Sequence, residues 1–351
     1  MDNIVEDFKP LAGKHCVTNS IRQIFNYNNI DLSEEMIFGL SEGLNFFYFD
    51  YKNFDYPMTG GRSKLFEFED NLATNLGIGL QIHKTTSIKK AYRSLKENIE
   101  NNNLLMVYVD MGELDYLYLP EGYHFGGHSI VVYGLLESKE EVYISDRDQK
   151  GFKVTMREEE KPNDYHILSI EALKNARNSK EKPYPPKNRW LEFNFEKIKD
   201  VDETIIKTAI KNNVNAMIDP PIRNLGVKGI KKFFELVVKD WSDFSIEKLK
   251  EAAFNTFIFI NQVGGTGGGI FRKMYGDFLI ESAAICKDEK LKLFGHNLKD
   301  IGEDWDEVGY QFYDIYEKED DSLLENISKE LEMIYYKEKE LFNKLYNYLN
   351  G

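Results

Sequence analysis

The sequence predicts an α+β protein with a mixed domain over residues 1–190 and a mostly α-helical domain over residues 191–351. The length of 351 residues suits two compact domains with separate apolar cores. Before residue 190, helical patterns alternate with strand patterns such as residues 104–110, whereas the later patterns are mostly helical. The proline-rich stretch at 183–186 is typical of a linker and marks the division.

The first clear element is a helix that begins close to Cys16. Apolar side chains follow it at helical spacing, at Val17, Ile21, Ile24 and Phe25. Cys16 therefore lies in the first turn, where unpaired amide groups and the positive end of the helix dipole favour an anion. We expect this position to lower the pKa of the thiol from its usual value of about 8.5 toward neutrality. Cys16 is thus a candidate nucleophile.

A β-hairpin supplies a candidate base and a carboxylate to orient it. Two glycines precede His128, which opens an apolar strand pattern, and a short polar turn separates this pattern from a second apolar run at 142–145. Asp146 follows the second run directly, so it lies within a few residues of being opposite His128. A carboxylate in that place can hold the imidazole of a general base. Cys16, His128 and Asp146 together therefore predict a cysteine catalytic triad.

Each of these residues can also have an ordinary structural role. Cys16 can be an inert core thiol, His128 a buried strand histidine and Asp146 the cap of a turn. Three features together favour the triad over three unrelated structural roles. They are the helix start at the cysteine, the two glycines before the histidine and the carboxylate that follows the adjoining strand.

The second half of the chain predicts a series of helices. Apolar side chains recur every three or four residues over 202–211, 227–238, 246–261, 272–286 and 322–349. In the last helix, Ser322 and Glu325 fit a capping box, and Glu338 interrupts an apolar stripe at heptad spacing. A terminal helix of this length more often docks on its own domain than forms a coiled coil, and a homodimer through the stripe is the alternative.

The glycine string at 264–269 does not fit the nucleotide-binding motifs. A P-loop needs Lys and then Ser or Thr after its last glycine, and Ile270 and Phe271 stand there instead. The preceding segment, 257–260, is typical of a helix rather than the strand that a dinucleotide fingerprint requires. We expect a tight backbone turn with Arg272 on the next helix, since glycines allow such a turn and a close approach of the backbone to a substrate.

Composition and charge exclude several functional classes. The net charge of −14 argues against nucleic-acid binding, which needs a basic face. The six histidines are scattered, and no motif predicts a metal or a cofactor. No apolar run approaches the roughly 20 residues of a membrane helix, and the first residues lack the pattern of a signal peptide. Because two cysteines cannot form a disulfide scaffold, we expect a cytoplasmic protein whose Cys16 stays reduced.

Several short motifs also follow one another in a distinctive order along nearly the whole chain. The N-terminal series is His15-Cys16 with Asn19 and Ser20, Glu34-Glu35-Met36 with Gly39, Glu42-Gly43, Gly60-Gly61-Arg62, Val109-Asp110, Gly126-Gly127-His128 and Asp146. The C-terminal series is the glycine string with Arg272, then Tyr275, Asp277-Phe278-Leu279 and Glu281. This order resembles the butirosin-biosynthesis acyltransferase family, whose members carry a papain-like domain followed by a helical domain.

The resemblance implies a papain-like fold used for synthesis rather than digestion. Members move an acyl group from a carrier-protein thioester to an amine and so make an amide in natural-product biosynthesis. By position, Cys16 would be the nucleophile, His128 the general base and acid, and Asp146 the orienting carboxylate. The implied partners are an acyl carrier protein bearing a phosphopantetheine thioester and a small-molecule amine.

One departure concerns the oxyanion hole. Papain-like peptidases usually have a glutamine a few residues before the cysteine, whereas residues 8–14 contain none. The backbone N–H of Cys16 is therefore the one donor that can be named from the sequence.

Amide formation also requires that an amine reach the acyl-enzyme before water does, which calls for a covered pocket. The aromatic residues of 46–51, with Tyr116, Tyr118 and Tyr123, are candidates to line it. The alternative is that most of them are ordinary core and edge-strand residues.

An acidic carrier protein needs a basic docking surface on this acidic chain. Two groups of cations are candidates. The first, around the proline-rich stretch, contains Lys180, Lys182, Lys187 and Arg189. The second contains Arg223, Lys228, Lys231 and Lys232. The alternative is that both groups are simply solvated faces.

The sequence therefore predicts a cysteine-dependent acyltransferase that forms an amide from a thioester-activated acyl donor. One alternative is a cysteine peptidase or amidase with the same triad and an open cleft. The other is a binding or scaffold protein of the same fold that has lost its activity.

Overall fold

The computed structural model describes residues 1–51, 54–117, 119, 122–147, 165–182 and 184–351. They form two compact units, one from residues 1–37 with 77–198 and the other from residues 38–76 with 199–351. The division expected at residue 190 differs from these units, because the segment 38–76 packs with the helices that follow it in the sequence by more than a hundred residues. Local patterns show where a strand or helix forms but not which core it joins.

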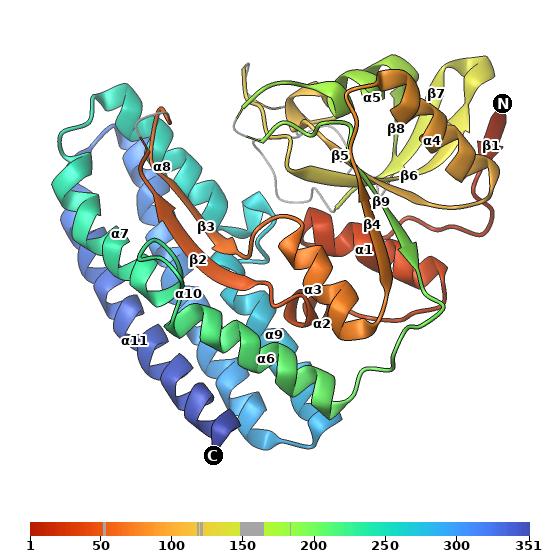
Figure 1. The fold of residues 1–351 in the computed structure, drawn as a ribbon. Coiled ribbons are helices and arrows are strands. Elements are labelled where there is room, and N and C mark those ends of the chain that lie inside the picture. Colours follow the sequence, from red (N-terminus) through yellow and green to blue (C-terminus); the bar gives the residue numbers. More distant parts are fainter. Residues whose placement is uncertain (52–53, 118, 120–121, 148–164, 183) are drawn as a thin grey trace. The chain divides into compact units, whose positions relative to one another are not determined.

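The first unit is an antiparallel sheet with helices on both faces (Figure 1). Its strands lie in the order β4-β9-β5-β6-β7-β8, and β1 pairs with the end of β6. Helix α1 (Cys16–Tyr27) covers one face, and α4 (Ile88–Glu100) and α5 (Ile170–Asn178) cover the other. The strands are β1 (Asp2–Ile4), β4 (Gly79–His83), β5 (Leu105–Val109), β6 (His128–Leu136), β7 (Glu141–Ser145), β8 (Tyr165–Ser169) and β9 (Trp190–Asn194).

The predicted hairpin is present as β6 and β7. Its register places Val131 opposite Ser145, so the residue after β7 lies close to the start of β6. A short 3-10 turn, Glu137–Lys139, joins the strands, and Glu140 adopts a positive φ at its end. This register explains how residues 128 and 146 reach the same edge of the sheet.

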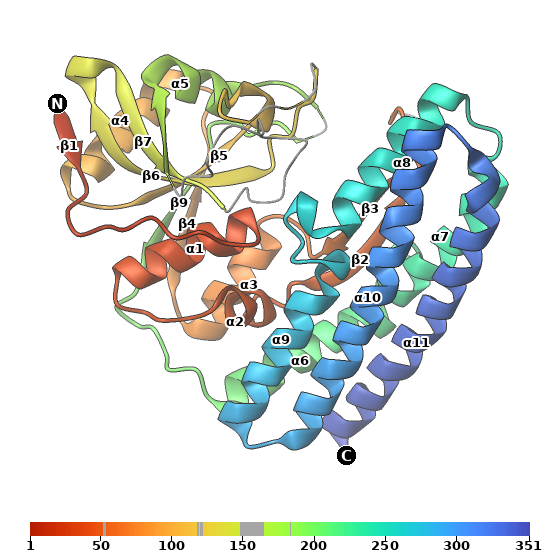
Figure 2. The same cartoon turned by 180° about the vertical axis from the view of Figure 1, so that it is seen from behind.

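The second unit combines a small hairpin with long helices (Figures 1 and 2). Helix α2 (Glu34–Leu40) leads the chain into it, and β2 (Leu44–Phe49) pairs antiparallel with β3 (Met58–Arg62) before α3 (Glu67–Leu76). The later helices are α6 (Glu203–Ile218), α7 (Gly226–Trp241), α8 (Ile246–Ile260), α9 (Arg272–Cys286), α10 (Glu289–Lys318) and α11 (Leu324–Asn350). None of the helices within the described ranges combines the length and the apolar character needed to cross a membrane.

The β2 strand belongs to the core of this unit. Its side chains alternate between buried and half-buried positions, which is the pattern of a strand with one face on the core. Phe46 and Tyr48 are fully buried, and both stack on Phe233 of α7. These contacts hold the segment 38–76 to helices that follow residue 199.

Helix α10 was not predicted from the sequence. Glycines recur at every seventh residue along it, at Gly295, Gly302 and Gly309, and glycine lowers helix propensity. At Gly295 packing requires the glycine, because a Cβ there would lie 2.6 Å from the carbonyl oxygen of Gly276 in α9. Close contact between α9 and α10 therefore overrides the local preference.

The glycine string forms the expected tight turn. Gly265, Gly267, Gly268 and Gly269 all have positive φ, and Arg272 is the first residue of α9. The turn packs inside its own unit, where the N–H of Gly269 donates to the carboxylate of Asp306 at 2.8 Å. The segment before it is helical, as predicted.

The interruption of the apolar stripe in α11 has a clear cause. Glu338 is fully buried and accepts hydrogen bonds from Arg272 Nε at 2.8 Å, Arg272 Nη2 at 3.0 Å and Trp305 Nε1 at 2.7 Å. The stripe around it is buried against α6, α7 and α10, so it docks on its own unit. The predicted capping box is wrong, because Ser322 donates to Asp320 in a 3-10 turn and α11 begins two residues later.

The Arg272–Glu338 pair gives a stability prediction. Glu338→Leu leaves the guanidinium buried without its carboxylate, and we expect it to lower the free energy of unfolding by about 3–5 kcal/mol. Arg272→Met/Glu338→Leu removes both charges and should recover part of this loss. Urea unfolding of the three proteins tests the expectation, and a double variant less stable than Glu338→Leu would contradict it.

Candidate active site

Cys16 is the first residue of α1, at the start of a helix whose inner face is buried. His15 occupies the N-cap position with extended backbone angles and provides no side-chain cap. The apolar residues predicted to continue the helix, Val17, Ile21 and Phe25, are fully buried. Packing of this face fixes the helix and, with it, the position of the Cys16 thiol, which is itself buried.

Glu34 serves as the cap of α1 from outside the helix. Its Oε1 accepts the N–H of Lys14 at 2.8 Å, and its Oε2 accepts the N–H of His15 at 3.1 Å and the hydroxyl of Thr18 at 2.6 Å. Burial raises the pKa of the Glu34 carboxyl above its usual range, although these donors act in the opposite direction. The carboxylate satisfies orphan amide groups that precede Cys16.

His128 and Asp146 lie in direct contact at the edge of the sheet. His128 Nε2 lies 2.8 Å from Asp146 Oδ2, and both side chains are buried. Since the carboxylate can only accept, Nε2 carries the hydrogen of this bond. The ring nitrogen that remains, Nδ1, is left for the hydrogen bond that joins His128 to the Cys16 thiol.

The electrostatics of the three residues favour a charged pair of thiolate and imidazolium. Burial raises the pKa of the Cys16 thiol, but the hydrogen bond and charge of His128, with the N–H of Ser129, lower it to below its ordinary value. Burial lowers the pKa of His128, yet the charge of Asp146 and its hydrogen bond raise it to about 9. Burial likewise raises the pKa of Asp146, and the charge of His128 lowers it by more.

Further contacts fix Asp146 in place. The hydroxyl of Tyr116 donates to Oδ2 at 2.8 Å, and the N–H of Arg147 donates to Oδ1 at 2.6 Å. Tyr116 stacks on His166, with 3.8 Å between ring centroids. Asn19, one turn after Cys16, donates from its side chain to the Asp146 carbonyl at 3.4 Å. Tyr116 and Arg147 therefore hold the carboxylate of Asp146, and Asn19 of the helix holds its backbone carbonyl.

Two buried polar residues tie α1 to the strands that carry the base and the carboxylate. Ser20 Oγ lies 3.2 Å from the hydroxyl of Ser129, the residue after the histidine. Gln23 Oε1 accepts the hydroxyl of Ser145 at 2.7 Å and the N–H of Leu11 at 3.0 Å. These hydrogen bonds fix the distance between the thiol and its partners. Breaking any one of them would leave a buried polar group without a hydrogen-bond partner, which is energetically costly.

Asp110 organises the loop that leads to His128. One carboxylate oxygen accepts the N–H groups of Gly112 at 3.1 Å and Phe125 at 2.9 Å. The other lies 2.9 Å from His124 Nδ1 and accepts the hydroxyl of Ser179 at 2.6 Å. No role was predicted for Asp110 or Glu34 beyond their place in the motif order. An acidic residue directly after a buried strand was the available signal for Asp110.

The aromatic residues proposed to line a pocket divide into different environments. Phe46 and Tyr48 are core residues of the second unit, so for these two the alternative of ordinary core residues applies. Tyr116 contacts the candidate triad through Asp146. Tyr118 lies outside the described residues.

The part of the chain that carries the candidate triad matches a known protein family. Residues 15–147, which include all three residues of the candidate triad, match the family model described as Butirosin biosynthesis protein H, N-terminal. This match supports the assignment of the chain to the butirosin-biosynthesis family. The family suggests an enzyme in antibiotic biosynthesis.

The second part of the chain also matches a family model. Residues 171–345 match a Domain of unknown function (DUF4872). The butirosin-biosynthesis family assignment agrees with the one expected from the order of the motifs. A search of curated proteins gave no match.

Thiol reactivity tests the electrostatics of the site. We expect Cys16 in the native protein to be alkylated by iodoacetamide at a pH below the range of an ordinary thiol, because His128 stabilises the thiolate. In His128→Ala the contacts that stabilise the thiolate are lost and its burial remains. The pH at which the alkylation rate of Cys16 begins to rise should therefore be higher in this variant. Mass spectrometry of peptides alkylated between about pH 5 and pH 10 measures this shift around the usual value.

The second cysteine provides an internal control. Burial raises the pKa of Cys286, which lies in the other unit, so its alkylation should begin at higher pH and be the same in both proteins. An unchanged Cys16 profile in His128→Ala would show that the imidazole does not set the reactivity of the thiol.

Proposed function

We propose that this chain is a cysteine-dependent acyltransferase that moves an acyl group from a carrier-protein thioester to a small-molecule amine and so forms an amide. The observation that carries the proposal is the buried hydrogen-bonded series of Cys16, His128 and Asp146. The butirosin-biosynthesis family supports a role in natural-product biosynthesis. Neither the carrier nor the amine follows from the site itself, and both come from the family.

The arrangement of the elements supports a papain-like catalytic unit. The nucleophile begins a helix that packs on an antiparallel sheet, the histidine opens one strand, and the carboxylate follows the adjoining strand. Cysteine, histidine and the orienting residue follow one another in the same order along the chain as in papain-like enzymes.

The proposed reaction has two steps with one proton to move. The Cys16 thiolate attacks the thioester carbonyl, a new carbon–sulfur bond forms, and the bond to the carrier sulfur breaks. His128 gives its proton to the departing thiolate and is left neutral. The amine then attacks the acyl-enzyme, His128 takes the proton that the amine loses, and the amide leaves with the thiolate and imidazolium restored.

The tetrahedral intermediates need donors for their oxyanion. The N–H groups of Lys14 and His15 are occupied by Glu34, so neither is available. We therefore assign the backbone N–H of Cys16 as a donor, which is the same group that the sequence indicated.

The cations around the proline-rich segment are the better candidate for carrier docking. Lys180, Lys182 and Lys187 are exposed and belong to the same unit as the triad. The segment that bears them is joined to the loop before His128 by the contact of Ser179 with Asp110 and by Phe125, whose ring meets that of Tyr184 with 5.6 Å between centroids. Pro183 lies outside the described residues.

Packing brings the same segment to the glycines before the base. A Cβ at Gly126 would lie 2.1 Å from the carbonyl oxygen of Tyr184, so the backbone there is in close contact. A carrier bound to these lysines would therefore lie near the strand that begins with His128.

Two of the four cations in the second group are paired with acidic side chains. Lys228 pairs with Asp219 at 3.0 Å, and Lys231 pairs with Glu235 at 3.5 Å. Its residues belong to the other unit. Paired lysines offer less charge to an acidic partner, so this group serves better as a control than as the docking surface.

A cysteine peptidase or amidase with the same triad is the second candidate, because the chemistry up to the acyl-enzyme is shared. The inactive scaffold is disfavoured by the thiol itself, since a structural cysteine in an apolar core has a raised pKa rather than a lowered one.

Intact mass spectrometry distinguishes these functions. After incubation with an acyl thioester, we expect an acyl adduct on the native protein and none on Cys16→Ala, which should lower transfer by about 10³-fold or more. Addition of an amine should convert the adduct to amide. Release mainly as free acid in the presence of amine would favour the hydrolase, and no Cys16-dependent adduct with any of a panel of donors would favour the scaffold.

Charge reversal tests the docking surface. We expect Lys180→Glu/Lys182→Glu/Lys187→Glu to raise the KM for a carrier-bound donor by about tenfold, because the acidic partner loses its complementary surface. The rate with a small soluble thioester should stay the same. The matched control is Arg223→Glu/Lys228→Glu/Lys231→Glu, and an equal effect of both triple variants would contradict the assignment.

A further inference from the structure

A second pair of histidine and carboxylate lies at the same edge of the sheet as the candidate triad. His124 Nδ1 lies 2.9 Å from Asp110 Oδ2, and the Asp110 side chain is fully buried. Val109 pairs with His128 in the register of β5 and β6, so Asp110 leaves β5 where His128 begins β6. Because His124 precedes His128 by four residues, the Cα atoms of the two histidines are at most roughly 14 Å apart.

The bond to Asp110 determines which nitrogen of His124 can accept a proton. Since the carboxylate can only accept, Nδ1 carries the hydrogen of this bond and Nε2 keeps its lone pair. Among the residues that the structure describes, none bonds to Nε2, and the side chain is 27% exposed. His128 differs, because its Nε2 bonds to Asp146 and its Nδ1 is engaged with Cys16. His124 therefore presents an accessible base, whereas both nitrogens of His128 are occupied.

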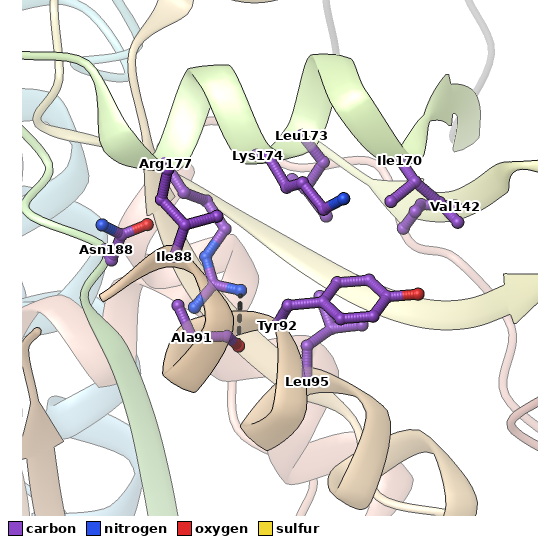
Figure 3. A pocket seen from close by; sticks show the side chains of 10 residues that line it. All are labelled: Ile88, Ala91, Tyr92, Leu95, Val142, Ile170, Leu173, Lys174, Arg177 and Asn188. Atoms are coloured by element: carbon purple, nitrogen blue, oxygen red, sulfur yellow. Dashed lines mark hydrogen bonds between the residues drawn. The ribbon is translucent and has the colours of Figure 1, made fainter. Parts of the chain in front are cut away.

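The end of α5 holds the carboxylate of Asp110 in place. The N–H of Asp110 donates to the carbonyl oxygen of Ala176 at 2.9 Å, and the hydroxyl of Ser179 donates to Oδ2 at 2.6 Å. Nη1 of Arg177 donates to the carbonyl oxygen of Ala91 at 3.2 Å, which ties this end of α5 to α4 (Figure 3). The carboxylate is thus fixed by the helices that cover this face of the sheet.

The backbone beside the histidine is fixed as well. The N–H of Phe125 donates to Asp110 Oδ1 at 2.9 Å, and its carbonyl oxygen accepts the N–H of Met111 at 3.1 Å. The imidazole of His124 is therefore oriented by its own bond to Asp110 and by the bonds of the next residue. Such preorganisation is what a catalytic base requires.

Amide formation from an alkylamine releases two protons. A primary amine such as the lysine side chain has a pKa of about 10.4, so it is an ammonium ion near neutral pH and has no lone pair with which to attack. One proton must leave before the carbon–nitrogen bond forms, and another leaves after it. Once the acyl-enzyme has formed, His128 is neutral and can take one of the two. The other proton needs a second base.

We propose that His124 is this second base and takes the first proton from an acceptor that arrives as an ammonium ion. This inference rests on the proposed function. The lone pair of Nε2 takes the proton, the neutral amine is left to attack the acyl-enzyme, and Asp110 stabilises the imidazolium that forms. The exposed ring then returns the proton to water. An acceptor that is already neutral has no need of His124.

Two acceptors of nearly equal size test this role. Ethylamine is an ammonium ion near pH 7, whereas methoxyamine, in which an oxygen replaces a methylene group, is neutral there. The full chain is acylated with the N-acetylcysteamine thioester of butyrate, one acceptor is added, and mass spectrometry follows loss of the acyl-enzyme and formation of the amide. The rates with the two acceptors are then compared between the native protein and variants.

His124→Asn keeps a side-chain N–H for Asp110 but lacks the nitrogen that accepts a proton. We expect this variant to lower the rate of transfer to ethylamine by about 10²-fold or more. Acylation of Cys16 and transfer to methoxyamine should stay as in the native protein, because neither needs the second base.

His83→Asn is the matched control. His83 is a partly exposed histidine of the same unit, and its Nε2 lies 3.0 Å from Glu192 Oε2. The proposal gives it no role, so transfer to both acceptors should be unchanged in this variant.

Four results would overturn the proposal, and they differ in what else they affect. An unchanged rate with ethylamine in His124→Asn would remove the role of His124 and leave the proposed function intact. An equal loss of acylation or of transfer to methoxyamine would show that the ring only supports the loop. The same selective loss in His83→Asn would show an effect common to exposed histidines. A native protein that forms no Cys16-dependent adduct would remove the proposed function and this inference with it.

Discussion

The hydrogen bond between His128 and Asp146 is the constraint on which the candidate active site depends. It occupies Nε2 of the ring at 2.8 Å and so leaves the other nitrogen for the Cys16 thiol. The bond exists because two strands pair in one register, with Val131 opposite Ser145. A shift of that register by one residue would turn the imidazole or the carboxylate to the other face of the sheet. Strand pairing therefore determines both the tautomer and the place of the base.

The way in which the thiolate is stabilised differs from the simplest expectation for a helix start. Glu34 takes the amide groups of Lys14 and His15, and its carboxylate offsets part of the positive potential at this end of α1. The lowered pKa of Cys16 comes instead from His128 and the N–H of Ser129, acting against burial. The capping of the helix and the activation of the nucleophile are thus served by different groups.

Much of the local structure and the site could be predicted from the sequence, because the signals are local. The helix at Cys16, the hairpin that ends at Asp146 and the turn before Arg272 all follow from periodicity and from residues with special backbone preferences. Contacts between distant segments could not be predicted in this way. The packing of residues 38–76 into the second core depends on such contacts, and so does the capping of α1 by Glu34. A single sequence gives no sign of them.

The division of the chain between its units has a consequence for biosynthesis and for engineering. The chain passes from one unit to the other at residues 37, 76 and 198, so the second core contains a hairpin made early and helices made late. On the ribosome, β2 must wait for α7 before Phe46 and Tyr48 can be covered, which exposes aromatic surface for the time needed to synthesise the intervening segment. A hybrid of two relatives would for the same reason need to inherit residues 38–76 and 199–351 from one parent.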